Sequence, residues 1–99
     1  MTESPHKRQL EQARSVMMLN RYNRATITAQ LVWIEDYLNF LTGKNPQDTG
    51  ESEIAAYIAH LASKPRVPAV TQNEALTAVL FYYKHILKKR LGLIHEPEE

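Results

Sequence analysis

Apolar residues recur at spacings of three and four in four separate segments of this chain. The second segment shows the pattern most clearly, with apolar side chains at Ile27, Leu31, Ile34, Leu38 and Leu41. That spacing gathers side chains on one face of an α-helix, and no segment alternates with the period of two typical of a strand. The sequence therefore predicts an all-α protein, a compact bundle of four helices.

Capping and turn residues set the expected helix boundaries. We expect helices over about residues 7–19, 26–42, 51–63 and 69–91, with Thr26 and Thr71 as N-cap residues. Gly43 and Gly92 are expected to close the second and fourth helices. Residues 7–92 then form one domain. Residues 1–6 are expected to be disordered, and residues 93–99 a disordered tail or the start of a linker.

Aromatic residues widen the apolar stripes of the second and fourth helices. Trp33, Tyr37 and Phe40 follow the apolar period, which favours a place in the core over a platform for stacking bases. Phe81 and Tyr82 stand next to Tyr83, so one ring of this run is expected to be partly exposed. An exposed ring there would form a surface patch for a partner protein.

Length and composition narrow the class of protein. The 99 residues suit one domain, and the absence of cysteine excludes a disulfide framework and a thiolate zinc site. The first residues lack the apolar run of a signal peptide, and no apolar run is long enough to cross a bilayer. We therefore expect a cytoplasmic location.

The net charge of +1 is distributed unevenly. Residues 7–24 hold five basic residues and one acid, residues 35–61 five acids and one lysine, and residues 64–90 six basic residues and one acid. Two basic segments thus flank an acidic middle. If folding brings the basic segments together, one face of the bundle is positive.

Signals of catalysis are weak in this sequence. None of the four histidines pairs with another at the helical spacing of a metal site, and no glycine-rich phosphate loop is present. His60 and His85 are expected on helix surfaces or at the edge of the core. We expect no catalytic residue, metal site or cofactor.

Two predicted helix starts resemble each other. The segments ATIT, from Ala25, and VTQN, from Val70, each open with small or polar side chains, and arginines precede both: Arg21 and Arg24 in one case, Arg66 in the other. A helix N-terminus can bind phosphate, and Gln, Asn and Thr side chains can contact bases. Plain capping would select the same residue types. The pattern alone leaves both interpretations open.

A set of motifs in order gives the chain a family resemblance. They are R-Y-N-x-x-T from Arg21, W-I at Trp33, F-L at Phe40, N-P-x-x-x-G-E-x-E-I-x-x-Y-I-x-H-L-A from Asn45 and V-T-Q-N-x-A-L-x-A-V-L-F-Y-Y from Val70. Together they resemble the N-terminal core-binding, SAM-like domain of tyrosine recombinases, or phage integrases, and most of all the integron-integrase branch. The resemblance extends from about residue 10 to residue 91.

The resemblance implies a four-helix DNA-binding module that holds one side of a duplex at a recombination site. The N-terminal portions of the second and fourth helices would face DNA. With the flanking arginines, the candidate DNA-binding residues are Arg21, Arg24, Thr26, Thr28, Arg66, Thr71, Gln72 and Asn73. Three positions depart from the family pattern: Gln30 replaces a usual aromatic residue, Thr28 a common lysine, and Glu74 places a negative charge near phosphate.

The resemblance also implies partners. Double-stranded DNA and other recombinase protomers in a synaptic complex are the expected partners of the full-length protein, while the isolated domain is expected to be monomeric and not to contact a membrane. A separate catalytic domain would cut and rejoin DNA, and its arginine and histidine pattern does not occur in this sequence. The alternative is a helical protein-interaction module that uses Phe81 or Tyr82 and has no DNA role.

Overall fold

The computed structural model describes residues 6–89. In order, its elements are α1 (Lys7–Leu19), α2 (Arg24–Phe40), the short 3-10 turn η1 (Pro46–Asp48), α3 (Glu51–Ala62), α4 (Ala69–Phe81) and the π-helical turn η2 (Tyr82–Leu87). The described residues contain no strand. The predicted all-α class and the four-helix bundle are therefore confirmed.

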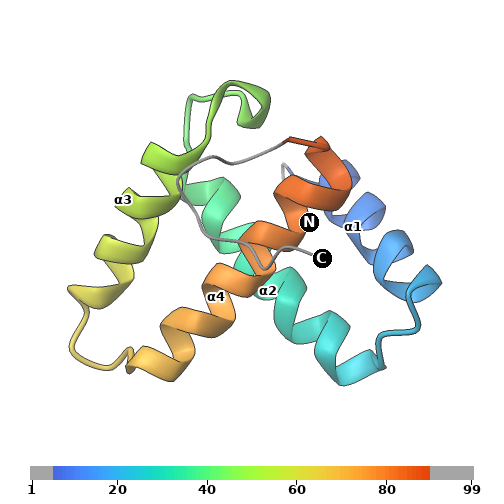
Figure 1. Cartoon of the computed structure of the whole chain (residues 1–99), viewed down its shortest axis with the longest axis horizontal. Helices are drawn as coiled ribbons and strands as arrows, with labels where there is room; N and C mark the ends of the chain where they lie inside the picture. Colours follow the sequence, from blue (N-terminus) through green and yellow to red (C-terminus); the bar gives the residue numbers. More distant parts are fainter. Residues whose placement is uncertain (1–5, 90–99) are drawn as a thin grey trace, which may run out of the picture.

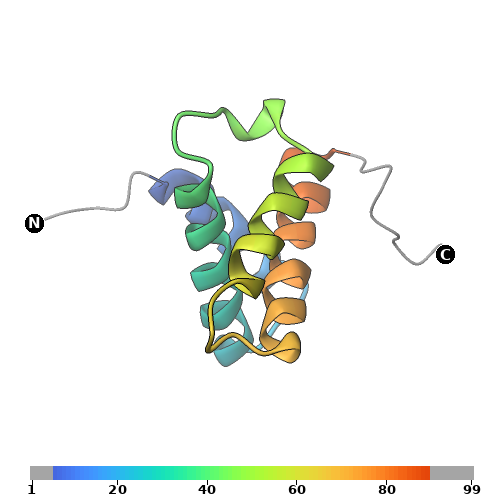
Figure 2. The ribbon, with the colours of Figure 1, turned by 90° about the vertical axis from the view of Figure 1, so that its left-hand side faces the viewer.

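The two central helices, α2 and α4, cross and pack against each other, while α1 packs on α2 and α3 packs on α4 (Figure 1). At the lower end of this view, the α1–α2 and α3–α4 connections lead into α2 and α4. The segment holding η1 lies at the opposite end, as the rotated view also shows (Figure 2). The N-termini of α2 and α4 thus share one end of the molecule.

The core lies where the four helices meet, and its largest fully buried side chains come from all of them. They are Tyr37, Tyr57, Tyr82, Tyr83, Met17, Ile34, Ile54, Leu61 and Val79. Leu10 of α1 and Ile58 of α3 are half-buried against this core. None of the described helices has the length and apolar character needed to cross a membrane.

Several expectations about aromatic side chains are wrong. Phe81 and Tyr82 are 7% and 1% exposed, so neither forms a surface patch. Phe81, the last residue of α4, packs against the rings of Tyr22 and His85. Tyr82 begins the π-helical turn, whose side-chain register differs from that of α4. The stripe on α2 divides: Tyr37 is buried, Trp33 is half-buried and Phe40 is 37% exposed.

Neither threonine expected as an N-cap has that position. The N-cap of α2 is Asn23, whose side-chain oxygen accepts the backbone N–H of Thr26 at 2.8 Å. Asparagine ranks above threonine at this position, which explains the earlier start. The N-cap of α4 is Pro68, which makes no side-chain cap hydrogen bond, and Thr71 is the third helical residue. Proline at the boundary lets the helix begin at the next residue.

The fourth helical segment ends sooner than the sequence indicates. Lys88 has a left-handed backbone with φ of 55°, and the backbone N–H of Lys89 donates to the carbonyl of Tyr83 at 2.9 Å. The helix therefore ends at Leu87, and the end expected at residue 91 lies outside the described residues. The predicted role of Gly92 lies outside the described residues, as do residues 1–5 and 93–99. His6 is described, and its Nε2 lies 3.0 Å from Oδ1 of Asn39.

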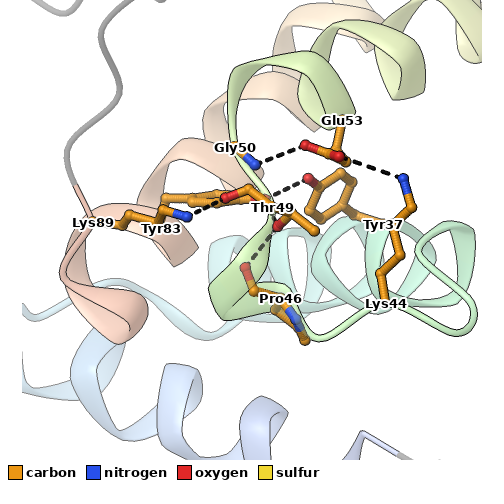
Figure 3. Close-up of polar contacts among 8 residues, drawn as sticks. All are labelled: Tyr37, Lys44, Pro46, Thr49, Gly50, Glu53, Tyr83 and Lys89. Carbon is orange, nitrogen blue, oxygen red and sulfur yellow. Dashed lines mark hydrogen bonds and ion pairs between the residues drawn. The ribbon is translucent and has the colours of Figure 1, made fainter.

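A chain of buried hydrogen bonds lies at the end of the bundle that holds η1 (Figure 3). The hydroxyls of Tyr37 and Tyr83 are 2.6 Å apart, the Tyr83 hydroxyl is 2.5 Å from Oγ1 of Thr49, and Thr49 donates to the carbonyl of Pro46 at 2.7 Å. Because the single Thr49 proton goes to Pro46, Tyr83 must donate to Thr49 and Tyr37 to Tyr83. The chain of donors ties α2 and η2 to η1.

Two charged side chains secure the same region from outside. Nζ of Lys89 donates to the carbonyl oxygens of Thr49 and Gln47 at 2.5 and 2.8 Å. Glu53 accepts the backbone N–H of Gly50 at 2.8 Å, just before α3, and its other oxygen lies 3.4 Å from Nζ of Lys44. Internal hydrogen bonds therefore close this end of the bundle. The N-termini of α2 and α4 lie at the opposite end.

Candidate nucleic-acid interface

An open groove of about 460 Å³ lies between the N-terminal halves of α2 and α4. Its walls are mostly apolar or uncharged, with one carboxylate. The lining residues are Ala25, Thr26, Ala29, Gln30, Trp33, Val70, Asn73, Glu74 and Thr77. The groove thus joins the two helix starts that the sequence singles out.

Both helices present the same pattern of positions to this groove. On α2 the lining residues after Ala25 are at i, i+3, i+4 and i+7 from Thr26; on α4 they follow the same spacing from Val70. That spacing is one face of a helix, distinct here from the face that packs on the core. The small side chains of Ala25 and Ala29 leave the α2 side of the groove open. Each of the two helices therefore has one face that packs on the core and a second face that lines the groove.

Exposed cationic residues stand where the chain enters each of these helices. Arg21 and Arg24 lie at the α1–α2 connection and the first turn of α2; Lys64 and Arg66 lie in the α3–α4 connection. Both connections are at the same end of the molecule (Figure 1). Within residues 6–89, none of these four side chains forms an ion pair with an acid. Their charges are available to an anionic partner.

Arg21 has an uncommon backbone conformation. Its φ is 64°, in the left-handed region that usually holds glycine or asparagine. Its N–H donates to the carbonyl of Met18 and that of Tyr22 donates to Met17, both at 3.0 Å. These two bonds form a Schellman motif that ends α1. The backbone of Arg21 is thereby fixed just before α2, at some cost in backbone strain.

The structure brings together only part of the predicted DNA-binding set. Thr26 and Asn73 line the groove, and the three arginines are exposed beside the helix starts. Thr28 is exposed on α2 but lies two positions from Thr26, on the opposite side of the helix from the groove.

Two residues of the VTQN segment also lie outside the groove. Gln72 is half-buried, and its Nε2 donates to the carbonyl of Val67 at 3.1 Å, so this side chain turns back to the loop. Thr71 is half-buried beside it. Asn73 is therefore the only member of the Thr71–Asn73 triplet among the groove-lining residues.

Sequence reasoning missed most of the groove wall. Trp33, Val70 and Thr77 are not among the predicted site residues, and Gln30 and Glu74 are named only as departures from the family pattern. The missing signal was the second helical face at i, i+3, i+4 and i+7 on both helices. Oε1 of Gln30 is buried in this wall and has no hydrogen-bond partner among the described residues. A buried acceptor without a partner favours binding of a group that donates a hydrogen bond to it.

Burial favours the neutral forms of several tyrosines and of one histidine outside the groove. Burial raises the pKa of Tyr82 to about 12. Burial, followed by the hydrogen bond to Asp36, raises the pKa of Tyr57 as well. Burial and the neighbouring Lys84 and Lys88 lower the pKa of His85. No group of three or more metal-ligating side chains occurs in the part of the chain that the structure describes.

Comparison with known proteins assigns the chain to a family. The sequence profile of the phage integrase N-terminal SAM-like domain matches residues 10–93. Proteins named integrase/recombinase from Escherichia coli and Pseudomonas aeruginosa are each 30% identical to the chain over 87 residues. That match covers 88% of the chain and 26% of each relative, so the chain spans about a quarter of their length. The chain belongs to the phage integrase N-terminal SAM-like domain family.

Proposed function

We propose that this chain is the DNA-binding module of a site-specific tyrosine recombinase, holding one side of a duplex while a separate catalytic domain cuts and rejoins the strands. The observation that carries the proposal is the position of exposed arginines, without an ion pair among residues 6–89, beside the groove between α2 and α4. Family membership supports a recombinase parent. The ordered set of motifs between Arg21 and Tyr83 resembles the integron-integrase branch most, so we propose that the parent belongs to that branch.

The chemistry of this end of the molecule suits a nucleic acid. Arginine side chains bind phosphate through several N–H donors in a fixed geometry, and helix N-termini add unpaired backbone N–H groups. Arg24 lies in the first turn of α2 and Arg66 in the connection before α4. Because they flank the groove from two helices, we propose that they contact phosphates on both sides of a duplex groove. Uncharged Thr26 and Asn73 between them are residue types that contact base edges.

The alternative function, a protein-interaction module built on Phe81 or Tyr82, loses its basis because both rings are buried. The groove itself also favours DNA over an apolar peptide, since the cationic residues stand at the same end of the bundle. Other recombinase protomers remain proposed partners of the full-length protein. The proposed place of action is the cytoplasm, where the DNA of a bacterial cell lies.

A titration with duplex DNA tests the proposal. The isolated chain should bind with a dissociation constant of roughly 10⁻⁴–10⁻⁶ M, falling in affinity as salt rises. Backbone amide shifts in an NMR titration should cluster at the starts of α2 and α4. Shifts confined to α3 or to η2 would contradict the proposed interface.

Substitution of the arginines tests the phosphate contacts. Arg24→Ala and Arg66→Ala should weaken binding to every duplex alike and reduce the salt slope by about one unit each. Lys84→Ala is the matched control, because Lys84 is an exposed cation in η2, away from the groove. If Lys84→Ala changes the slope as much as the arginine variants do, binding follows total charge and the proposed site is wrong.

A further inference from the structure

Two hydrogen-bond acceptors in the groove have no partner within the described chain. Oε1 of Gln30 is buried and unpaired, and Glu74 is exposed on the facing helix without an ion pair. Both residues line the same groove. A site that binds only phosphate would present hydrogen-bond donors. The two acceptors in this groove therefore suit a group that carries hydrogen-bond donors.

An acceptor pair discriminates between the two parts of a nucleic acid. A carboxylate repels phosphate oxygens, whereas it accepts a hydrogen bond from an exocyclic amine on a base edge. In the major groove, aspartate and glutamate pair with the N4 amine of cytosine. Guanine O6 and N7 and thymine O4 are acceptors and would leave both protein oxygens unsatisfied. Adenine has an N6 amine, but its neighbouring N7 is an acceptor and would oppose the second protein oxygen.

The remaining groove wall suits the edge of a base. Ala25 and Ala29 leave room for close approach, while Trp33 and Val70 supply apolar surface next to the acceptors. The cations at the helix entrances are separate from this wall, since none of Arg21, Arg24 and Arg66 lines the groove. Phosphate binding and base reading are thus assigned to different residues.

We infer that Glu74, supported by Gln30, selects the exocyclic amine of a base, with cytosine N4 donating to the Glu74 carboxylate. The inference rests on the proposed function, because it presumes that a duplex lies against this groove. It changes the meaning of Glu74 from a defect in phosphate binding to a determinant of specificity. Such a residue lowers affinity for wrong sequences as well as raising it for the right one.

The test is enrichment from a pool of duplexes with a randomised central segment, using the 99-residue chain. The wild type should enrich sequences with cytosine at one fixed position. Glu74→Gln should bind the starting pool about twofold tighter, since a repelling charge is gone. Glu74→Met, which removes both acceptor oxygens, should lose discrimination at that position by roughly 5- to 150-fold, the range for one good base contact.

Two further variants make the result interpretable. Glu11→Gln removes the same charge from an exposed position on α1, outside the groove, so it should leave the enrichment pattern unchanged. Gln30→Met removes the unpaired acceptor with little change in shape. It should raise the melting temperature by several degrees, because a buried unsatisfied oxygen is gone, while weakening the cytosine preference.

The outcomes separate the inference from the proposed function. Salt-sensitive binding of the pool without any cytosine preference in the wild type overturns the inference and leaves the DNA-binding role in place. Retention of the full preference by Glu74→Met overturns it as well. If the wild-type chain does not bind the pool even at low salt, the proposed function fails first.

Discussion

Replacing Tyr83 by phenylalanine removes the middle hydroxyl of the buried hydrogen-bond chain that joins α2, η1 and η2. In the wild type, Tyr37 donates to Tyr83 and Tyr83 donates to Thr49, over 2.6 and 2.5 Å. The variant loses both bonds. Thr49 keeps its bond to Pro46, but the Tyr37 hydroxyl is left in the core, where the tyrosine is 0% exposed.

The magnitude follows from counting what is lost and what is stranded. A net hydrogen bond contributes about 0.5–1.5 kcal/mol, and a buried donor without a partner costs about 1–3 kcal/mol. Tyr83→Phe loses the bond to Thr49 and strands the Tyr37 donor, so it should lower the free energy of unfolding by about 1.5–4.5 kcal/mol. Tyr37→Phe removes only the end of the chain and leaves Tyr83 bonded to Thr49, so it should cost about 1 kcal/mol.

Urea denaturation followed by far-ultraviolet circular dichroism measures these differences. Tyr82→Phe is the control: its ring is as buried as that of Tyr83, yet within the described residues its hydroxyl makes no hydrogen bond. That substitution should stay within about 0.5 kcal/mol. Equal losses for Tyr83→Phe and Tyr82→Phe would refute the reasoning, because ring burial alone would then account for both.

Three further predictions concern helix ends. Asn23→Ala should destabilise the chain by about 1 kcal/mol through loss of the α2 cap, whereas Thr71→Ala should not show a cap effect; thermal melts of both variants compare them. Arg21→Gly should raise stability by about 1 kcal/mol by relieving the left-handed backbone, and should weaken duplex binding in the same preparation; a stabilised variant with unchanged affinity would remove Arg21 from the interface. The pKa of Glu53 is lowered, chiefly by the hydrogen bond from the Gly50 N–H, then by its own backbone N–H, with Lys44 adding to the effect. The stability that Glu53 contributes is therefore present above its ordinary pKa of 4.5 and disappears as pH falls through the lowered value. Glu53→Gln should flatten that acid-side decline in denaturation curves between about pH 5 and 3, and a decline of unchanged steepness would contradict the assignment.

The helices were predictable because their apolar period is strong and local. The first helix begins and ends where the sequence indicates, and the third differs by one residue. The caps were harder to predict because neighbouring residues compete for them. Asn23 precedes Thr26 and takes the cap of α2, while Pro68 fixes the start of α4 without regard to Thr71. Short-range preference cannot rank such competitors when tertiary packing also selects the first turn.

The groove could be predicted only in part. The helix starts pointed to Thr26 and Asn73, but residues that line a second face of a buried helix carry the same apolar signal as the core. Trp33 was therefore assigned to the interior. The direction of the Gln72 side chain depends on the carbonyl of Val67 in the preceding loop, which no spacing rule shows. The inward turn of Tyr82 depends likewise on the π-helical register of η2.

The position of Trp33 gives the chain a built-in optical reporter. It is the only tryptophan, and its half-buried indole lines the groove between α2 and α4. Indole emission shifts in wavelength when surrounding water is displaced and is quenched by stacked nucleobases. The arrival of an occupant in the groove should therefore change the intrinsic fluorescence of the unlabelled protein. With excitation at 295 nm, where tyrosine absorbs little, the five tyrosines would contribute almost nothing to that signal.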